Sequence, residues 1–92
     1  MGWSNDKLYI NVHDNQGTGW ALGRIGTAEN WREQAMDWAD SDGNDETYDE
    51  LRVMNRDIIP DYVSDVWDIQ LKPLSELTHE EFDDLKEIMH II

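Results

Sequence analysis

The sequence predicts a single α+β domain across residues 1–92, in which a small, mostly antiparallel sheet of three strands packs with about three helices. Three observations predict this class. Apolar residues alternate with polar ones before residue 14, which is the period of a strand. Apolar residues recur at three- and four-residue steps after residue 27, which is the period of a helix. A chain of 92 residues has room for one hydrophobic core, because domains usually contain about 100–150 residues.

The first quarter of the chain predicts a β-hairpin. Between Lys7 and His13 every second side chain is apolar, which predicts a strand whose one buried face is formed by Leu8, Ile10 and Val12. Residues 14–19 are turn formers that tolerate or favour positive φ. The following segment from Trp20 to Ile25 predicts the return strand.

The first helix is predicted from Ala28 to about Asp40, with Thr27 as its N-cap. Its apolar stripe consists of Ala28, Trp31, Ala35, Trp38 and Ala39. Residues 40–46 contain no apolar side chain, so we expect a solvated loop after this helix.

A second helix is predicted from Tyr48 towards Ile58. Thr47 and Glu50 have the spacing of a capping box, in which each side chain accepts a backbone hydrogen bond at the start of a helix. Pro60 is expected to stop the helix. The side chains expected to be buried are Leu51, Met54 and Ile58.

The next segment fits two periods. Tyr62, Val66 and Ile69 fit a helical stripe, whereas residues 67–72 alternate as in a strand. We favour the strand, because β-branched and aromatic residues cluster there and Pro73 bounds the segment.

The last helix has the clearest start. Thr78 and Glu81 form a second capping box, and Leu77 and Phe82 occupy the two positions of a hydrophobic staple. The helix is expected to continue to the end of the chain, with an inner face of Phe82, Leu85, Ile88 or Met89, and Ile92.

The charge of the chain is strongly negative. It has 21 acidic and 7 basic side chains, which gives a formal net charge of -14. The net charge of a small domain usually has a magnitude of about 2–8. Five tryptophans and 39% hydrophobic residues supply enough apolar surface for folding. The absence of cysteine excludes disulfides, thiolate metal sites and a cysteine nucleophile. No segment resembles a secretory signal or a membrane span, so we expect a soluble, cytoplasmic protein without membrane contact.

The acidic residues gather in two segments. The first holds seven carboxylates in a window without lysine or arginine: Asp37, Asp40, Asp42, Asp45, Glu46, Asp49 and Glu50. The second holds six beside a single lysine: Glu76, Glu80, Glu81, Asp83, Asp84 and Glu87. A thinner series between them consists of Asp57, Asp61, Asp65 and Asp68.

Such clusters oppose folding, because like charges one helical turn apart repel each other. A binding role would offset this cost. Carboxylates one turn apart are separated by about 5–6 Å at Cβ, which is the same order as the roughly 3.4 Å axial spacing of phosphates on one DNA strand. We therefore expect the two clusters to contact a basic, nucleic-acid-binding protein. Direct binding of nucleic acid is disfavoured, because so negative a surface repels phosphate.

Small size, extreme acidity, absence of cysteine, many tryptophans and helices edged with Asp and Glu resemble the DNA-mimic inhibitors of phages and mobile elements, among them anti-CRISPR and antirestriction proteins. The run from Leu8 to Asp14, a glycine turn, and a helix around residues 30–33 are similar to the start of an antirestriction domain. The resemblance implies a non-catalytic inhibitor that occupies the DNA- or PAM-binding cleft of a defence nuclease.

Metal and phosphate sites fit the sequence less well. A calcium loop needs Gly at position six and Glu at position twelve, whereas counting from Asp40 places Gly43 at four and Leu51 at twelve. The glycines at 17, 19 and 23 miss the dinucleotide fingerprint and lie between two predicted strands. The histidines form no metal-binding motif, so we expect neither metal nor cofactor; they are His13, His79 and His90.

Catalysis is also disfavoured. His13 and Asp14 with Ser4 or Ser64 form no recognisable nucleophile motif, so we expect no catalytic residue. The tryptophans are assigned to the core at Trp31, Trp38 and Trp67, and to exposed interface anchors at Trp3 and Trp20. Three alternative functions stay open: an immunity or antitoxin protein that covers a basic toxin nuclease, a salt-adapted acidic domain, and a weak calcium-binding domain.

Overall fold

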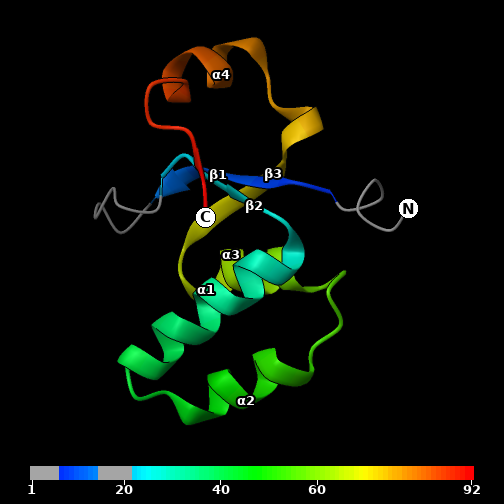
Figure 1. Ribbon diagram of the computed structural model, residues 1–92, viewed down its shortest axis with the longest axis vertical. Coiled ribbons are helices and arrows are strands. Elements are labelled where there is room, and N and C mark those ends of the chain that lie inside the picture. The colour runs from blue at the N-terminus through cyan, green and yellow to red at the C-terminus, as the bar shows by residue number, and fades with distance from the viewer. Residues whose placement is uncertain (1–6, 15–21) are drawn as a thin grey trace.

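A four-stranded sheet lies at the centre of the fold (Figure 1). The computed structural model describes residues 7–14 and 22–92. The strands are β1 (Tyr9–Asp14), β2 (Arg24–Gly26), β3 (Ile69–Pro73) and β4 (His90–Ile91), arranged in the order β3-β1-β2-β4. β1 is antiparallel to β2 and β3, whereas β4 is parallel to β2. The α+β class is therefore confirmed, but the expected sheet of three mostly antiparallel strands is wrong, because the sheet is mixed and has a fourth strand.

Helices cover both faces of this sheet (Figure 1). The described helices are α1 (Ala28–Ser41), α2 (Asp45–Val53), α3 (Ile59–Val66) and α4 (His79–Leu85), with a 3-10 turn η2 (Leu74–Glu76) before α4. α1 and α3 lie on one face of the sheet, and α2 packs against the side of α1 that is remote from the sheet (Figure 1). α4 lies on the opposite face. The part of the chain that the structure describes thus has four α-helices, one more than expected.

Two groups of buried side chains correspond to these two faces. The larger lies between α1, α2, α3 and the sheet and consists of Trp31, Ala35, Leu51, Ile59, Val63 and Ile69. The smaller lies between the sheet and α4 and consists of Ile10, Ile25 and Leu85. Trp31 is fully buried, and Trp38 and Trp67 pack on the larger core, as predicted. Trp3 and Trp20 lie outside the described residues.

The hairpin prediction is correct in outline. β1 occupies most of the predicted first strand, and it pairs with β2 through Tyr9 opposite Gly26 and Ile10 opposite Ile25. The expectation of one buried face is wrong, because helices cover both sides of the sheet and Asn11 is fully buried. Of the predicted return strand, residues 20–21 lie outside the described part of the chain, and the observed strand begins at Arg24.

The first helix agrees with its prediction. The Thr27 hydroxyl accepts a hydrogen bond from the N–H of Asn30, and the Asn30 side chain accepts one from the N–H of Thr27. The helix ends at Ser41, close to the expected Asp40. The Nε1 of Trp31 donates to the backbone oxygen of Tyr9 at 3.1 Å, which holds the helix against β1.

The predicted loop at residues 40–46 is much shorter in the structure. α1 continues to Ser41, and Asn44 rather than Thr47 is the N-cap of α2, because the Asn44 side chain accepts a hydrogen bond from the N–H of Thr47. The connecting turn is residues 42–44. Gly43 has a φ of 70°, a conformation that glycine adopts without strain.

The predicted second helix, 48–58, is also wrong at its end. α2 ends at Val53, and a new helix, α3, begins at Ile59. Pro60 does not stop a helix but occupies the first turn of α3, where its missing N–H has no intrahelical partner to lose. Leu51 is fully buried as expected, but Ile58 is 53% exposed because it precedes α3 at a surface turn.

Both periods that competed after Pro60 are real, in succession. α3 runs to Val66, and β3 begins at Ile69 rather than at Trp67. Asp68 separates the two elements with a φ of 54°, the left-handed conformation that commonly ends a helix. Within α3 the buried residues are Ile59, Pro60 and Val63, whereas Val66 is 41% exposed.

The last helix begins as predicted and ends early. Thr78 and Glu81 form the expected capping box. The helix stops at Leu85, and residues 90–91 form β4 beside β2, so the predicted helix to the end of the chain is wrong. Leu85 is buried, but Phe82 is 46% exposed because the short helix covers only part of the sheet. β-branched residues near the end favour this strand pairing over a helix.

Candidate functional site: two acidic surfaces

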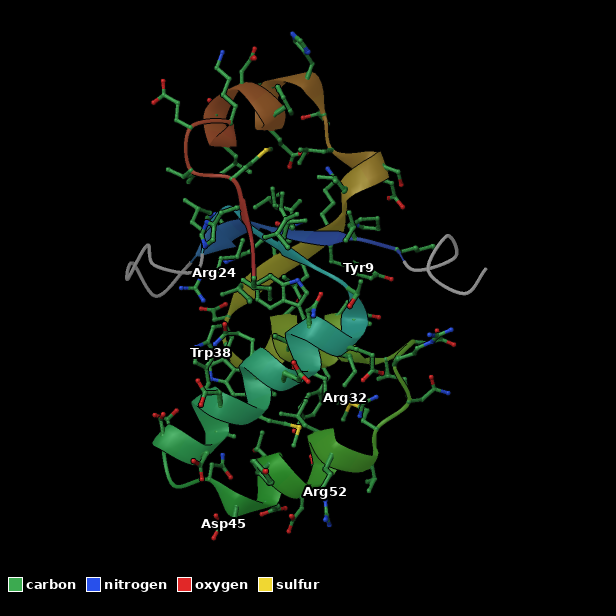
Figure 2. The ribbon with its side chains drawn as sticks, in the orientation of Figure 1. Tyr9, Arg24, Arg32, Trp38, Asp45 and Arg52 are labelled. Carbon is green, nitrogen blue, oxygen red and sulfur yellow. The ribbon has the colours of Figure 1, made fainter. Side chains whose placement is uncertain are left out.

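The seven carboxylates of the first predicted cluster are all exposed, and they follow the C-terminal half of α1, the turn after it, and α2. Figure 2 shows Asp45 at the lower end of the molecule, where α2 lies, remote from the sheet. The first acidic surface is defined as Asp37, Asp40, Asp42, Asp45, Glu46, Asp49 and Glu50. The structure thus brings together the residues that the sequence placed in one window.

The two halves of this surface have opposite relations to the helix dipoles. Asp45 and Glu46 lie in the first turn of α2, where the partial positive charge of a helix N-terminus stabilises carboxylates. Asp40 lies in the last turn of α1 and Asp42 is its C-cap, where the partial charge is negative. No basic residue occupies the last turn of α1. The carboxylates in the first turn of α2 therefore stabilise that helix, whereas those at the C-terminal end of α1 destabilise α1.

Two contacts tie members of the first acidic surface to neighbouring side chains. Arg52 lies 3.9 Å from Asp49, with both side chains well exposed, so their attraction is weak. The Tyr62 hydroxyl donates to Glu50 at 2.8 Å. Burial, together with this hydrogen bond and the charge of Glu50, raises the pKa of Tyr62 above its ordinary value. Glu50 therefore has a structural contact between α2 and α3.

The second acidic surface surrounds α4 and consists of Glu76, Glu80, Glu81, Asp83, Asp84 and Glu87. Glu81 differs from the rest, because its carboxylate lies 2.7 Å from Nζ of Lys72 and accepts the N–H of Thr78. The hydrogen bond from Lys72, followed by that from Thr78, lowers the pKa of Glu81 below its ordinary value. Glu81 joins α4 to β3 and is occupied by that contact.

Asp83 also has basic side chains as neighbours. His79 lies 3.6 Å and Lys86 3.8 Å from its carboxylate oxygens. All three side chains are at least half exposed, so these pairs contribute little to stability. The second acidic surface is therefore more neutralised by local cations than its sequence suggests.

The two acidic surfaces do not merge. α2 and α4 lie at opposite ends of the longest axis of the molecule, with the sheet between them (Figure 1). The thinner series is exposed on α3 and at its two ends, at Asp57, Asp61, Asp65 and Asp68. A partner that binds at one end of the molecule therefore contacts only one of the two acidic surfaces.

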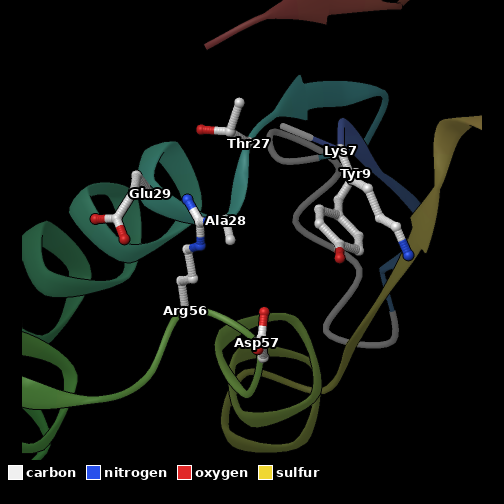
Figure 3. Close-up of a pocket in the computed structure, with 7 residues that line it drawn as sticks. All are labelled: Lys7, Tyr9, Thr27, Ala28, Glu29, Arg56 and Asp57. Carbon is white, nitrogen blue, oxygen red and sulfur yellow. The ribbon is translucent and has the colours of Figure 1, made fainter. Parts of the chain in front are cut away.

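A pocket of about 390 Å³ lies where β1 begins, where α1 begins, and beside the α2–α3 connection (Figure 3). Its described lining residues are Lys7, Tyr9, Thr27, Ala28, Glu29, Arg56 and Asp57. The lining combines two cations with two carboxylates, and Glu29 is already 3.0 Å from Arg32. No motif of the sequence indicated this pocket, because its residues come from three separate segments.

Metal binding and membrane spanning were also considered for residues 7–14 and 22–92. No group of three or more His, Asp or Glu side chains in residues 7–14 and 22–92 is arranged to hold a metal ion. The histidines are distributed over the ends of β1, α4 and β4, at His13, His79 and His90. None of the described helices has the length and apolar character needed to cross a membrane.

Sequence reasoning missed the side chains that hold the acidic elements in place. In the sequence, Lys72 belongs only to the alternating segment 67–72, and Tyr62 only to the helical stripe that competes with it. Their contacts join residues 9 and 12 positions apart, which a local pattern does not reveal. The single lysine that the sequence does place near the second cluster, Lys86, lies beside Asp83.

Comparison of the chain with protein-family models, curated proteins and solved structures finds no match. The function is therefore inferred from the residues and their geometry.

Proposed function

We propose that this protein is a non-catalytic, cytoplasmic inhibitor that blocks the nucleic-acid-binding cleft of a basic defence nuclease, such as a CRISPR effector or a restriction enzyme, by presenting DNA-like negative charge. The observation that carries the proposal is the exposure of all seven carboxylates of the first acidic surface on adjoining elements at one end of the molecule. Carboxylates on one helix and its adjoining turn can replace a row of phosphates in a cleft lined by Lys and Arg.

The stability cost of Asp40 and Asp42 supports a binding role for this surface. Both oppose the dipole at the end of α1, and Asp37 adds a third carboxylate one turn earlier. A surface that served solubility alone could carry its charge where the helix dipoles favour it, as Asp45 and Glu46 do. The first acidic surface is therefore the preferred contact, ahead of the second, in which Glu81 and Asp83 already have cationic neighbours.

The proposal is tested by inhibition of purified nucleases. The protein is added to a panel of CRISPR effector complexes and restriction enzymes, and binding of labelled duplex DNA is measured at several salt concentrations. We expect it to displace DNA from its target, to be displaced by excess DNA in turn, and to bind more weakly as salt increases.

The residues are tested by two variants that remove the same number of charges. Replacement of Asp42, Asp45, Glu46 and Asp49 by Asn or Gln should abolish inhibition without unfolding. Replacement of Asp57, Asp61, Asp65 and Asp68 by Asn should leave most of it. If the second variant lost more inhibition than the first, the nuclease would not bind through the first acidic surface. If the bound partner proved to be a toxin nuclease, and excess DNA did not displace this protein from it, the protein would instead be an immunity protein.

A further inference from the structure

The two edges of the sheet differ in whether another strand can join them. β3 forms one edge, and there the N–H of Leu71 donates to the hydroxyl of Ser64 on α3 at 3.0 Å. Ser64 in turn donates to the backbone oxygen of Pro60 at 2.7 Å. Pro73, at the end of the same strand, has no N–H. The β3 edge therefore offers no free N–H at Leu71 or at Pro73.

Among the strands of residues 7–14 and 22–92, β4 forms the other edge. The N–H groups of His90 and Ile92 donate to the backbone oxygens of Gly23 and Ile25 in the direction of β2. Because successive residues of a strand direct their N–H and C=O groups to opposite sides, those of Ile91 point away from β2. The backbone of Ile91 is thus directed towards a position that a fifth strand could occupy.

Exposed apolar side chains accompany this edge. Ile92 packs on the larger core, so the alternation of a strand directs Ile91 to the α4 side of the sheet, where it is 73% exposed. Ile88, just before β4, is 43% exposed. The short α4 leaves this part of its sheet face incompletely covered. An added strand would bury apolar surface as well as make main-chain hydrogen bonds.

We propose that the β4 edge binds an extended, lysine- or arginine-bearing segment of the partner as a fifth strand. The inference rests on the proposed function for the identity of the partner, and it adds a second contact to the acidic surfaces. The charge of the occupant follows from the protein: a net charge of -14 repels a second copy and attracts a cationic segment, and Asp84 and Glu87, which precede β4 in the chain, are exposed and add to this attraction.

The edge is tested without any nuclease. The full chain, labelled for residue-resolved NMR, is titrated with a synthetic peptide in which lysine and valine alternate. We expect the amide signal of Ile91 to shift and its hydrogen exchange to slow. The same peptide with every backbone amide methylated keeps its charge but has no N–H to donate at either edge, so it should bind about tenfold more weakly, the loss expected for one or two main-chain hydrogen bonds.

Two variants separate strand addition from simple charge attraction. Ile91→Lys should weaken binding about tenfold, because it places a cation opposite the lysine peptide and removes the apolar contact. Val53→Lys is the matched control, since Val53 is 78% exposed on α2 and the substitution changes the net charge equally. Protection of the Ile92 N–H shows whether β4 stays paired with β2.

Equal weakening by both substitutions, equal binding of the methylated peptide, or no response at Ile91 would each overturn the strand addition. These outcomes would not affect the DNA-mimic proposal, which is tested separately by displacement of DNA from a nuclease and by the carboxylates of α2.

Discussion

Glu81 shows how one acidic residue can serve the fold in a chain with excess negative charge. Its carboxylate completes the capping box of α4 and accepts a hydrogen bond from Lys72 on β3. The folded-state pKa of Glu81 is lowered, chiefly by Lys72. The ionised carboxylate therefore stabilises the fold at pH values above the ordinary carboxyl pKa of 4.5, and this contribution is lost as the pH falls through the lowered folded-state value.

Glu81→Gln should therefore lower the melting temperature at neutral pH, and its difference from the parent protein should narrow as the pH falls below about 4.5. Gln can still accept the capping hydrogen bond, so the substitution isolates the charge. Glu80→Gln is the control, because Glu80 lies in the same first turn. Thermal unfolding over a pH series measures both. A difference that stayed constant down to acidic pH would mean that Lys72 and Glu81 are not coupled as described.

Asn11 is a residue-scale feature that the sequence pattern could not reveal. Its Oδ1 accepts the N–H groups of His13 and Gln70 where the pairing of β1 with β3 is irregular. The alternation of β1 placed Asn11 on a polar, exposed face, but the helices that bury that face come from residues far along the chain. A strand's own pattern shows which side chains share a face, and not whether that face is covered.

At the scale of elements, local signals predicted where most helices and strands occur, and distant contacts decided where they end. The capping residues Thr27 and Thr78 were recognised because a cap acts within three residues. Pro60 was misread, since the same residue can end one helix or begin the next. β4 was missed because its strand character depends on β2, more than sixty residues earlier. The acidic clusters were predictable, and their separation by the sheet was not.

The N-cap of α2 gives a direct test at this scale. Asn44→Ala should destabilise the protein by about 1 kcal/mol, because the N–H of Thr47 loses its acceptor at the start of the helix. Asn44→Asp is the matched control, since Asp caps helices about as well as Asn and its charge favours a helix N-terminus. Urea unfolding followed by tryptophan fluorescence measures the free energy of unfolding. If Asn44→Ala cost nothing, the helix would have to begin elsewhere.

At the scale of the whole molecule, the first acidic surface includes α2 and the second surrounds α4. The sheet lies between these two helices (Figure 1). Mutual repulsion within a chain of net charge -14 lowers its stability. Some carboxylates reduce this cost by lying in the first turn of a helix or by pairing with a cation, as Asp45 and Glu81 respectively do. Others, such as Asp40 and Asp42 at the C-terminal end of α1, add to this cost, and the proposed binding role would account for their presence there.

Stability and inhibition should consequently change in opposite directions at the end of α1. Asp40→Asn and Asp42→Asn should each raise the free energy of unfolding by about 0.3–1 kcal/mol, because each removes a negative charge from a helix C-terminus, and together they should weaken inhibition. Asp45→Asn should lower stability, because it removes a charge that the N-terminus of α2 favours. Unfolding and DNA displacement are measured on the same preparations. If the substitutions at Asp40 and Asp42 stabilised the protein and left inhibition intact, these carboxylates would be a solubilising surface, and the DNA-like contact would have to lie elsewhere.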